Sequence, residues 1–133
     1  MFMQVMNELL KKEGYETLAE ICLPHSFPYQ NIKEHFGEYD CTAAELYVIT
    51  SFLAETTFND YDRLIQLCDA LGMSQGICLI EKRLVDAVRR YGFNESTLKK
   101  WDSIFQLKYY FDKLSSSNIY DLFFDEIRSV TFD

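Results

Sequence analysis

Apolar residues recur every three to four positions along almost the whole chain, which is the spacing of one face of an α-helix. No segment of useful length shows the alternation of a half-buried β-strand. Helices are expected at residues 2–13, 16–23, 43–55, 60–72, 75–91, 95–114 and from 119 onward, with a further turn or two at 31–36. The pattern therefore predicts an all-α fold, a compact irregular bundle of six to eight helices.

Capping residues mark the ends of several of these segments. Thr42 and Glu45 have the spacing of a capping box in front of the helix at 43–55. Either Asn59 or Asp60 is expected to cap the helix that follows. The other expected N-caps are Ser74, Asn94 and Asn118, and the expected terminal glycines are Gly14, Gly72 and Gly92.

The composition is that of one globular domain spanning residues 1–133. Of the 133 residues, 48% are hydrophobic and 16% aromatic, enough for a packed core without a disulfide or a structural metal. The formal charge of −8 argues against nucleic acid or an anionic membrane as a partner, because both need clustered Lys and Arg. The basic residues of the segment EKRLVDAVRR alternate with Glu81 and Asp86, which a solvated helix face explains.

The cysteines and the apolar runs predict a cytoplasmic protein. Four cysteines without a C-x-x-C pair stand among apolar neighbours, where a free thiol behaves as a small hydrophobe: Cys22, Cys41, Cys68 and Cys78. The first ten residues lack the basic start of a signal peptide. No apolar run approaches the roughly 18 residues that a membrane span requires.

The segment YDRLIQLCDALG, residues 61–72, contains the first candidate site residue. At about 100° per residue, one broad apolar arc is expected to hold Leu64, Ile65, Leu67, Cys68 and Leu71. Asp62, Gln66 and Asp69 fall along the edge of that arc. Periodicity alone makes them rim residues of an amphipathic helix, and it assigns Asp69 no chemistry.

The two histidines and the known catalytic patterns add little by themselves. His25 lies in a proline-flanked loop, and Cys22-x-x-His25 has the spacing of half a zinc site without a second pair nearby. His35 is expected at a helix end, where it can interact with the helix dipole. The sequence contains no Gly-rich phosphate loop, no G-x-S-x-G and no H-E-x-x-H.

Five segments together resemble the C-terminal two thirds of a bacterial HD-domain protein. They are HSFPYQNI, GEYDCTAAE, YDRLIQLCDALGM, LIEKRLVDAVRRYG and NIYDLF, and they span nearly the whole chain. The resemblance implies an all-helical fold from a superfamily of metal-dependent phosphohydrolases. It also implies that Asp69 matches the late Asp ligand of the divalent metal, and that His25 matches an additional histidine serving a second metal or the phosphate.

The pattern of that family is incomplete in this chain, which contains no His-Asp dipeptide. A catalytic divalent ion needs several protein ligands and an open water position, so Asp69 and His25 form only a partial metal site. The sequence therefore predicts an HD-like domain with its N-terminal helices missing and without hydrolase activity of its own. No cofactor is expected for this chain. Complete family members would hold a divalent metal and hydrolyse a phosphorylated small molecule, a phosphate ester or anhydride.

Two alternatives follow from the missing helices. The first is a helical interaction module that self-associates as a homodimer, with Phe2, Met6 or Leu10 near the contact, because a large bare apolar surface is rare on a soluble monomer. The second is that another chain supplies the absent metal ligands, which would place a metal at Asp69 in an oligomer.

Overall fold

The computed structural model describes the backbone of residues 2–32 and 41–132, and side chains in these ranges from Val5 onward. Helices dominate the described ranges, and the predicted all-α fold of six to eight helices is confirmed. The elements are α1 (Phe2–Lys12), α2 (Glu16–Cys22), the 3-10 turn η1 (Pro24–Ser26), α3 (Ala43–Glu55), α4 (Asp60–Leu71), strands β1 (Gly72–Met73) and β2 (Gly76–Ile77), α5 (Ile80–Tyr91), α6 (Thr97–Ser115), α7 (Ile119–Leu122) and α8 (Phe124–Phe132).

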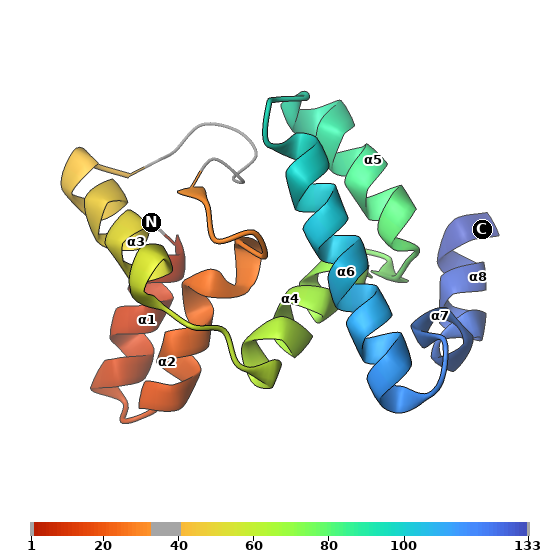
Figure 1. Ribbon diagram of the computed structural model, residues 1–133, viewed down its shortest axis with the longest axis horizontal. Coiled ribbons are helices and arrows are strands. Elements are labelled where there is room, and N and C mark those ends of the chain that lie inside the picture. The colour runs from red at the N-terminus through yellow and green to blue at the C-terminus, as the bar shows by residue number, and fades with distance from the viewer. Residues whose placement is uncertain (1, 33–40, 133) are drawn as a thin grey trace.

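The first two helices form an antiparallel pair joined by a tight turn (Figure 1). Gly14 sits in this turn with a φ of +83°, a backbone conformation that residues with a Cβ rarely adopt. Asn7 is buried at the contact between the helices, and its side-chain amide donates to the backbone oxygen of Ala19 at 2.5 Å. The pair is thus held by a buried polar contact as well as by apolar packing.

A first apolar cluster joins α3 to the segment between α2 and residue 32. Ile49 and Leu53, one helical turn apart on α3, pack against Leu23 and Phe27. The predicted capping box is present at the start of α3: the Thr42 hydroxyl accepts from the Glu45 amide, and the Glu45 carboxylate accepts from the Thr42 amide at 2.7 Å. This local signal explains why the bounds of α3 match the prediction.

A second and larger cluster is built from α4, α5, α6 and α7. Its buried residues are Leu67, Ala70, Leu71, Ile80, Leu84, Ile104 and Ile119. Trp101 packs against this cluster from α6, and its indole nitrogen is buried without a hydrogen-bond partner among the described residues.

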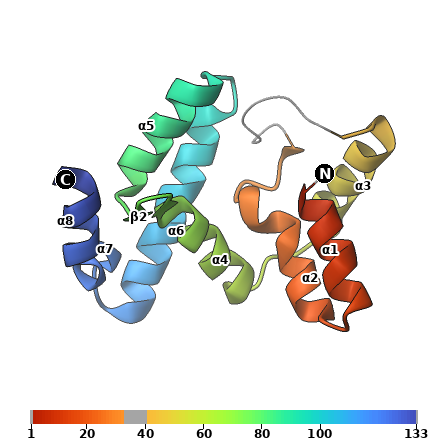
Figure 2. The ribbon, with the colours of Figure 1, turned by 180° about the vertical axis from the view of Figure 1, so that it is seen from behind.

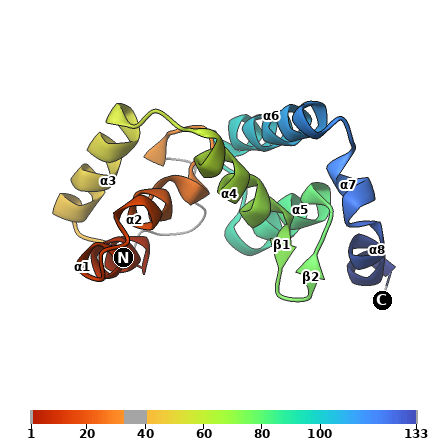
Figure 3. The same ribbon diagram turned by 90° about the horizontal axis from the view of Figure 1, so that it is seen from below.

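Helix α4 lies between the two groups of helices in all three views (Figures 1, 2 and 3). On one side are α1, α2 and α3; on the other are α5, α6, α7 and α8. Contacts of α4 with η1, α5 and α6 connect the two sides. Seen from behind, α4 lies in front of α6 (Figure 2).

The chain between α4 and α5 differs from the prediction. Strands β1 and β2 form a short antiparallel hairpin below α4 and α5 (Figure 3), with Gly72 opposite Ile77. Ser74 lies in its turn, so the prediction that it caps a helix is wrong, and α5 begins at Ile80. The Cys78 amide donates to the Leu71 oxygen at 2.8 Å, which returns the chain to the end of α4.

Differences at the other predicted elements are smaller. Asn118 caps α7 as predicted, but the last helix is interrupted at Phe123 and continues as α8. Asn94 bonds the Ser96 amide and precedes the first residue of α6 by three positions. Most of the turn expected at 31–36, including His35, lies outside the described residues.

The four cysteines are free thiols, as expected. Within the described ranges, none of the helices combines the length and the apolar character needed to span a bilayer.

Candidate functional site

Helix α4 buries a different face from the one that periodicity predicts. Asp62 and Gln66 are only 6% and 2% exposed, whereas Leu64 and Ile65 are each 42% exposed. Cys68 is exposed as well. The expectation that Leu64, Ile65 and Cys68 face the core, with Asp62 and Gln66 on the rim, is therefore wrong, although it holds for Leu67 and Leu71.

Two specific hydrogen bonds explain why polar groups of α4 turn inward. Asn59 caps the helix, settling the choice between Asn59 and Asp60, and the Asp62 carboxylate accepts from the Asn59 amide at 2.9 Å. Gln66 donates through Nε2 to the backbone oxygen of Pro24 at 3.1 Å. Buried polar groups are tolerated when they are bonded in this way. Of the two bonds, the one from Gln66 to Pro24 joins α4 to another element and therefore fixes the rotation of the helix against its neighbours.

Where α4 meets η1, α5 and α6, the structure has a cavity of about 140 Å³. His25 and Asp69, the two site residues that the resemblance implies, both line it. The remaining lining residues are Ser26, Pro28, Gln66, Ala70, Arg83, Leu84, Ala87, Tyr91, Lys100 and Ile104. The fold thus brings together residues that lie 44 positions apart in the sequence.

The bond that His25 makes determines its role at the cavity. Its Nδ1 lies 2.7 Å from the backbone oxygen of Cys22, and because a carbonyl oxygen only accepts, Nδ1 carries the proton. Nε2 is then the nitrogen left to accept a proton or to contact a ligand. Histidine ligands of metals are commonly oriented by such a bond.

Cys22 does not complete a zinc pair with His25. Its thiol bonds back to the Leu18 oxygen one turn earlier at 3.5 Å. Burial raises the pKa of the Cys22 thiol, which disfavours the thiolate that binds metals.

Gln66 has an unsatisfied acceptor at the cavity. The bond from Nε2 to Pro24 fixes the orientation of the amide, because the carbonyl of Pro24 cannot donate. Its Oε1 is buried and has no hydrogen-bond partner among the described residues. A buried acceptor without a partner costs about 1–3 kcal/mol.

Two cationic side chains line the same cavity, and periodicity does not identify them. Lys100 extends from α6 to η1 and donates to the Ser26 oxygen at 3.1 Å. Arg83 extends from α5 and is partly buried, and it forms no ion pair with the described carboxylates. A solvated helix face explains the exposed Arg89 and Arg90 but not Arg83. No signal in the segment EKRLVDAVRR distinguishes Arg83 from these two arginines.

The donor set at the cavity does not fit a catalytic divalent ion. Such an ion takes at least three protein ligands and keeps a position for water. His25 and Asp69 supply two, and within residues 2–32 and 41–132 no group of three or more His, Cys, Asp or Glu side chains is placed to hold a metal. The positive groups Arg83 and Lys100 suit an anion better than a cation at this position.

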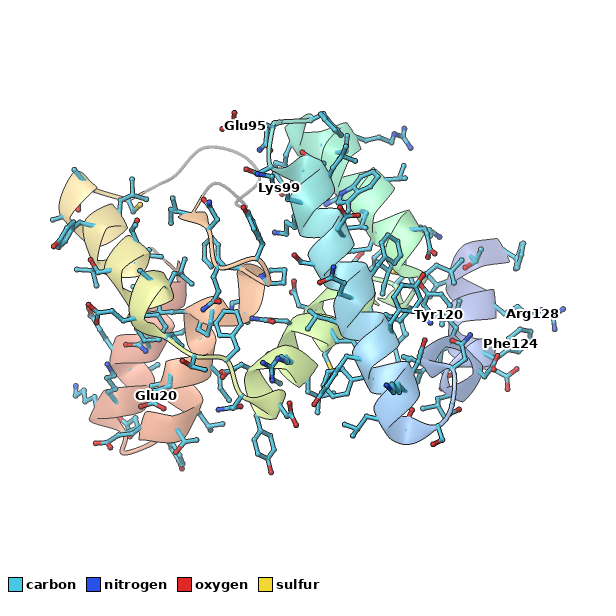
Figure 4. All side chains as sticks on the ribbon, viewed as in Figure 1. Glu20, Glu95, Lys99, Tyr120, Phe124 and Arg128 are labelled. Carbon is cyan, nitrogen blue, oxygen red and sulfur yellow. The ribbon has the colours of Figure 1, made fainter. Side chains whose placement is uncertain are left out.

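A second, more apolar hollow of about 410 Å³ lies at the C-terminal end of the fold. Tyr120, Phe124 and Arg128 gather there, on α7 and α8 (Figure 4). Of the residues named from the sequence it holds only the helix cap Asn118, and it shares no lining residue with the cavity that holds His25 and Asp69.

Comparison with protein-family models, curated proteins and solved structures finds no match. The resemblance to HD-domain proteins therefore stays a prediction from the sequence.

Proposed function

We propose that this chain is an HD-phosphohydrolase-like helical domain that binds a small phosphorylated molecule in the cavity beside α4, in the cytoplasm, and does not hydrolyse it alone. The observation that carries the proposal is that two cationic side chains, Arg83 and Lys100, line the same cavity in a chain whose net charge is −8. Cationic groups gathered at a recess of an acidic protein favour an anionic ligand there.

The chemistry of the lining supports a phosphate group in particular. The guanidinium of Arg83 presents parallel N–H donors that match phosphate oxygens, and the ammonium of Lys100 adds a point charge. His25 can contribute a further contact through Nε2. The carboxylate of Asp69 would receive hydroxyl or amino groups from the rest of the ligand. The cavity, of about 140 Å³, suits the phosphate group itself, so the remainder of a larger ligand such as a nucleotide would lie at its mouth.

We infer that the chain does not hydrolyse the ligand because it offers too few metal-binding side chains. Hydrolysis in the resembled family depends on a divalent metal that activates water, and Asp69 with His25 is too small a set to hold that ion for chemistry. A chain that supplies the missing ligands from outside this sequence would restore the reaction, a metal-dependent hydrolysis of a phosphate ester or anhydride.

Calorimetric titration with inorganic phosphate and with a nucleoside monophosphate tests binding. Arg83→Gln is expected to weaken the affinity by about tenfold, since a charge-assisted pair is worth roughly 1.5–3 kcal/mol. Arg89→Gln, on the exposed side of the same helix, is the matched control and should leave the affinity unchanged. Equal weakening by both variants would reduce the effect to net charge and contradict a built site.

A hydrolysis assay tests the second half of the proposal. The wild-type chain is incubated with the same nucleotide and with Mg²⁺ or Mn²⁺, and no turnover is expected. Robust metal-dependent turnover that Asp69→Asn abolishes would show that the ligand set is complete and would refute catalytic incompetence.

The second candidate is an interaction module that forms a homodimer through α1. The observation in its favour is the exposure of Val5 and Leu9, at 54% and 48%. Met6 and Leu10, which the sequence places near such a contact, are half-buried, and the side chain of Phe2 lies outside the described residues. Light scattering should give a dimer that Leu9→Ser dissociates, and a monomer at high concentration would contradict this candidate.

A further inference from the structure

The outward face of α4 carries a strip of large apolar and thiol side chains. Tyr61 is 74% exposed, Leu64 and Ile65 are 42% exposed, and Cys68 is exposed too. We propose that this strip is the docking site for an amphipathic helix of a partner protein, with an apolar face flanked by Lys or Arg. The proposal concerns the face of α4 opposite the core, and it shares only Asp69, at the edge of that face, with the proposed phosphate cavity.

The spacing of the four residues indicates a helical partner. They stand at positions i, i+3, i+4 and i+7, which form a continuous ridge along one side of a helix. Ridges of this kind pack into the groove between the ridges of a second helix. The view from behind shows α4 at the surface, with α6 on its far side (Figure 2).

The residues on the inward-facing side of α4 explain why the ridge on its outward side is exposed. The bond from Gln66 to Pro24 directs this side of α4 inward, and the opposite apolar residues consequently face outward. This bond holds the helix in its rotation, so the strip cannot turn into the core without breaking it. Exposed apolar strips on a folded surface commonly mark sites of protein interaction.

The charge around the ridge indicates a basic partner. Asp60 and Asp69 lie on α4 beside the ridge, and both are exposed. Glu20 of α2, also exposed, lines the same hollow as Tyr61. The one cation of α4, Arg63, is already paired with Asp60 at 3.0 Å. Asp60 also accepts from the Tyr110 hydroxyl at 2.9 Å. Lysines or arginines flanking the apolar face of a partner would therefore meet Asp69 and Glu20.

Charge and area both argue against a second copy at this position. Two chains of net charge −8 repel each other, most strongly where acidic edges would face acidic edges. A helix of 12 residues is about 18 Å long, and four side chains along it offer less than the roughly 800 Å² per partner of a standard dimer interface. The strip fits a single docked helix, a recognised mode of peptide binding.

Three synthetic helical peptides provide the test. The first repeats Leu at i, i+3, i+4 and i+7 with Lys on both flanks; the second has the same Leu positions with Glu on the flanks; the third scrambles the Lys peptide. Fluorescence anisotropy should show binding of the first, about tenfold weaker binding of the second and none of the third. Equal binding of the Lys and Glu peptides would overturn the basic character of the partner.

Variants of the ridge locate the contact. Leu64→Ser and Ile65→Ser should each weaken the binding of the Lys peptide by about tenfold, because each removes an apolar anchor from the ridge. Val85→Ser, at a residue of α5 that is 53% exposed, is the matched control and should have no effect. Circular dichroism verifies that all three variants fold, and unchanged binding in both ridge variants would refute the site.

Alkylation of Cys68 supplies a readout without mutation. The Lys peptide should slow its reaction with iodoacetamide, measured by mass spectrometry, while the partly buried Cys22 reacts as before. Protection of Cys22 alone, or of neither, would contradict docking on α4. Light scattering that shows a dimer which Ile65→Ser converts to a monomer would assign the strip to a second copy and overturn the proposal.

Discussion

Gln66 carries two hydrogen-bonding groups into the interior, and only one has a partner. Its Nε2 donates to the Pro24 oxygen, whereas its Oε1 is buried without a partner in the described part of the chain. The same side chain therefore stabilises the contact between α4 and η1 and leaves an unsatisfied acceptor in the interior.

Replacing Gln66 separates these two effects. Gln66→Met keeps the volume, loses one bond of about 1 kcal/mol and removes an orphaned acceptor of similar cost, so we expect a change below about 1 kcal/mol. Gln66→Ala also leaves a void and should cost about 2–3 kcal/mol. Urea unfolding measures both. A loss near 3 kcal/mol in the Met variant would mean that Oε1 has a strong partner.

Tyr120 links α5 to α7 through its hydroxyl. The hydroxyl donates to the Glu81 carboxylate at 2.7 Å and accepts from the Ile80 amide at 3.1 Å. Burial raises the pKa of Tyr120 far above the ordinary value of 10.0, and the bond to Glu81 raises it further. The folded chain thus keeps a proton that the unfolded chain releases.

This raised pKa predicts a loss of stability in alkali. The stabilisation is fully present below pH 10.0, and it declines as the pH rises from there toward the pKa of the folded state, because only the unfolded state loses the proton. Tyr120→Phe should cost about 1–2 kcal/mol at neutral pH. Urea unfolding over the alkaline range should show this difference shrinking above pH 10.0, and a constant difference would contradict the mechanism.

At the scale of elements, we expect the cap at the N-terminus of α4 to contribute most to stability among the helix caps. Asn59 accepts from the Tyr61 and Asp62 amides, while Asp62 closes the box from inside the protein. Asn59→Ala should cost about 1–2 kcal/mol, because it removes the cap of the helix that lies between both apolar clusters. Gln106→Ala, exposed on α6, is the control and should change the stability little. Thermal unfolding of both variants checks this.

Local signals predict some of the helix ends in this chain, and tertiary signals are missing from the pattern. The capping box at Thr42 depends on residues three positions apart and is predicted directly, whereas the sequence leaves the cap of α4 open between Asn59 and Asp60 and wrongly predicts a cap at Ser74. The hairpin at 72–77 has strands of two residues, too short for any periodicity. The inward rotation of Gln66 depends on Pro24, 42 positions away, which the pattern of one helix cannot contain.

The same distinction applies to the cavity. The resemblance to HD-domain proteins singles out His25 and Asp69, and both line the cavity. Arg83 and Lys100 remain unidentified by pattern, because their role arises only when α5 and α6 meet η1. Long polar side chains on helices are usually solvated, and nothing local distinguishes Arg83 from Arg89.

At the scale of the whole molecule, two apolar clusters share one connecting helix. The cluster around Leu53 and the cluster around Leu84 have no buried member in common. Polar contacts that cross between the groups include the bonds of Lys100 to Ser26 and of Gln66 to Pro24. Because the two clusters share no buried residue, we expect their stabilities to be partly independent.

Paired core variants test this independence. Leu53→Ala and Leu84→Ala each truncate a leucine that is at most 4% exposed and should each cost about 2–5 kcal/mol. Hydrogen exchange should show faster opening of α1, α2 and α3 in the first variant, and of α5 and α6 in the second. Equal acceleration across all helices in both variants would show a single cooperative unit.

The fluorescence of Trp101 reports on only one of the two groups of helices. As the one tryptophan of the chain, packed on the cluster around Leu84, it reports by its emission on that half alone. Far-ultraviolet ellipticity, by contrast, sums the helices of both. A heating curve in which emission shifts at a higher temperature than ellipticity falls would identify α1, α2 and α3 as the half that melts first, with no label attached to the protein.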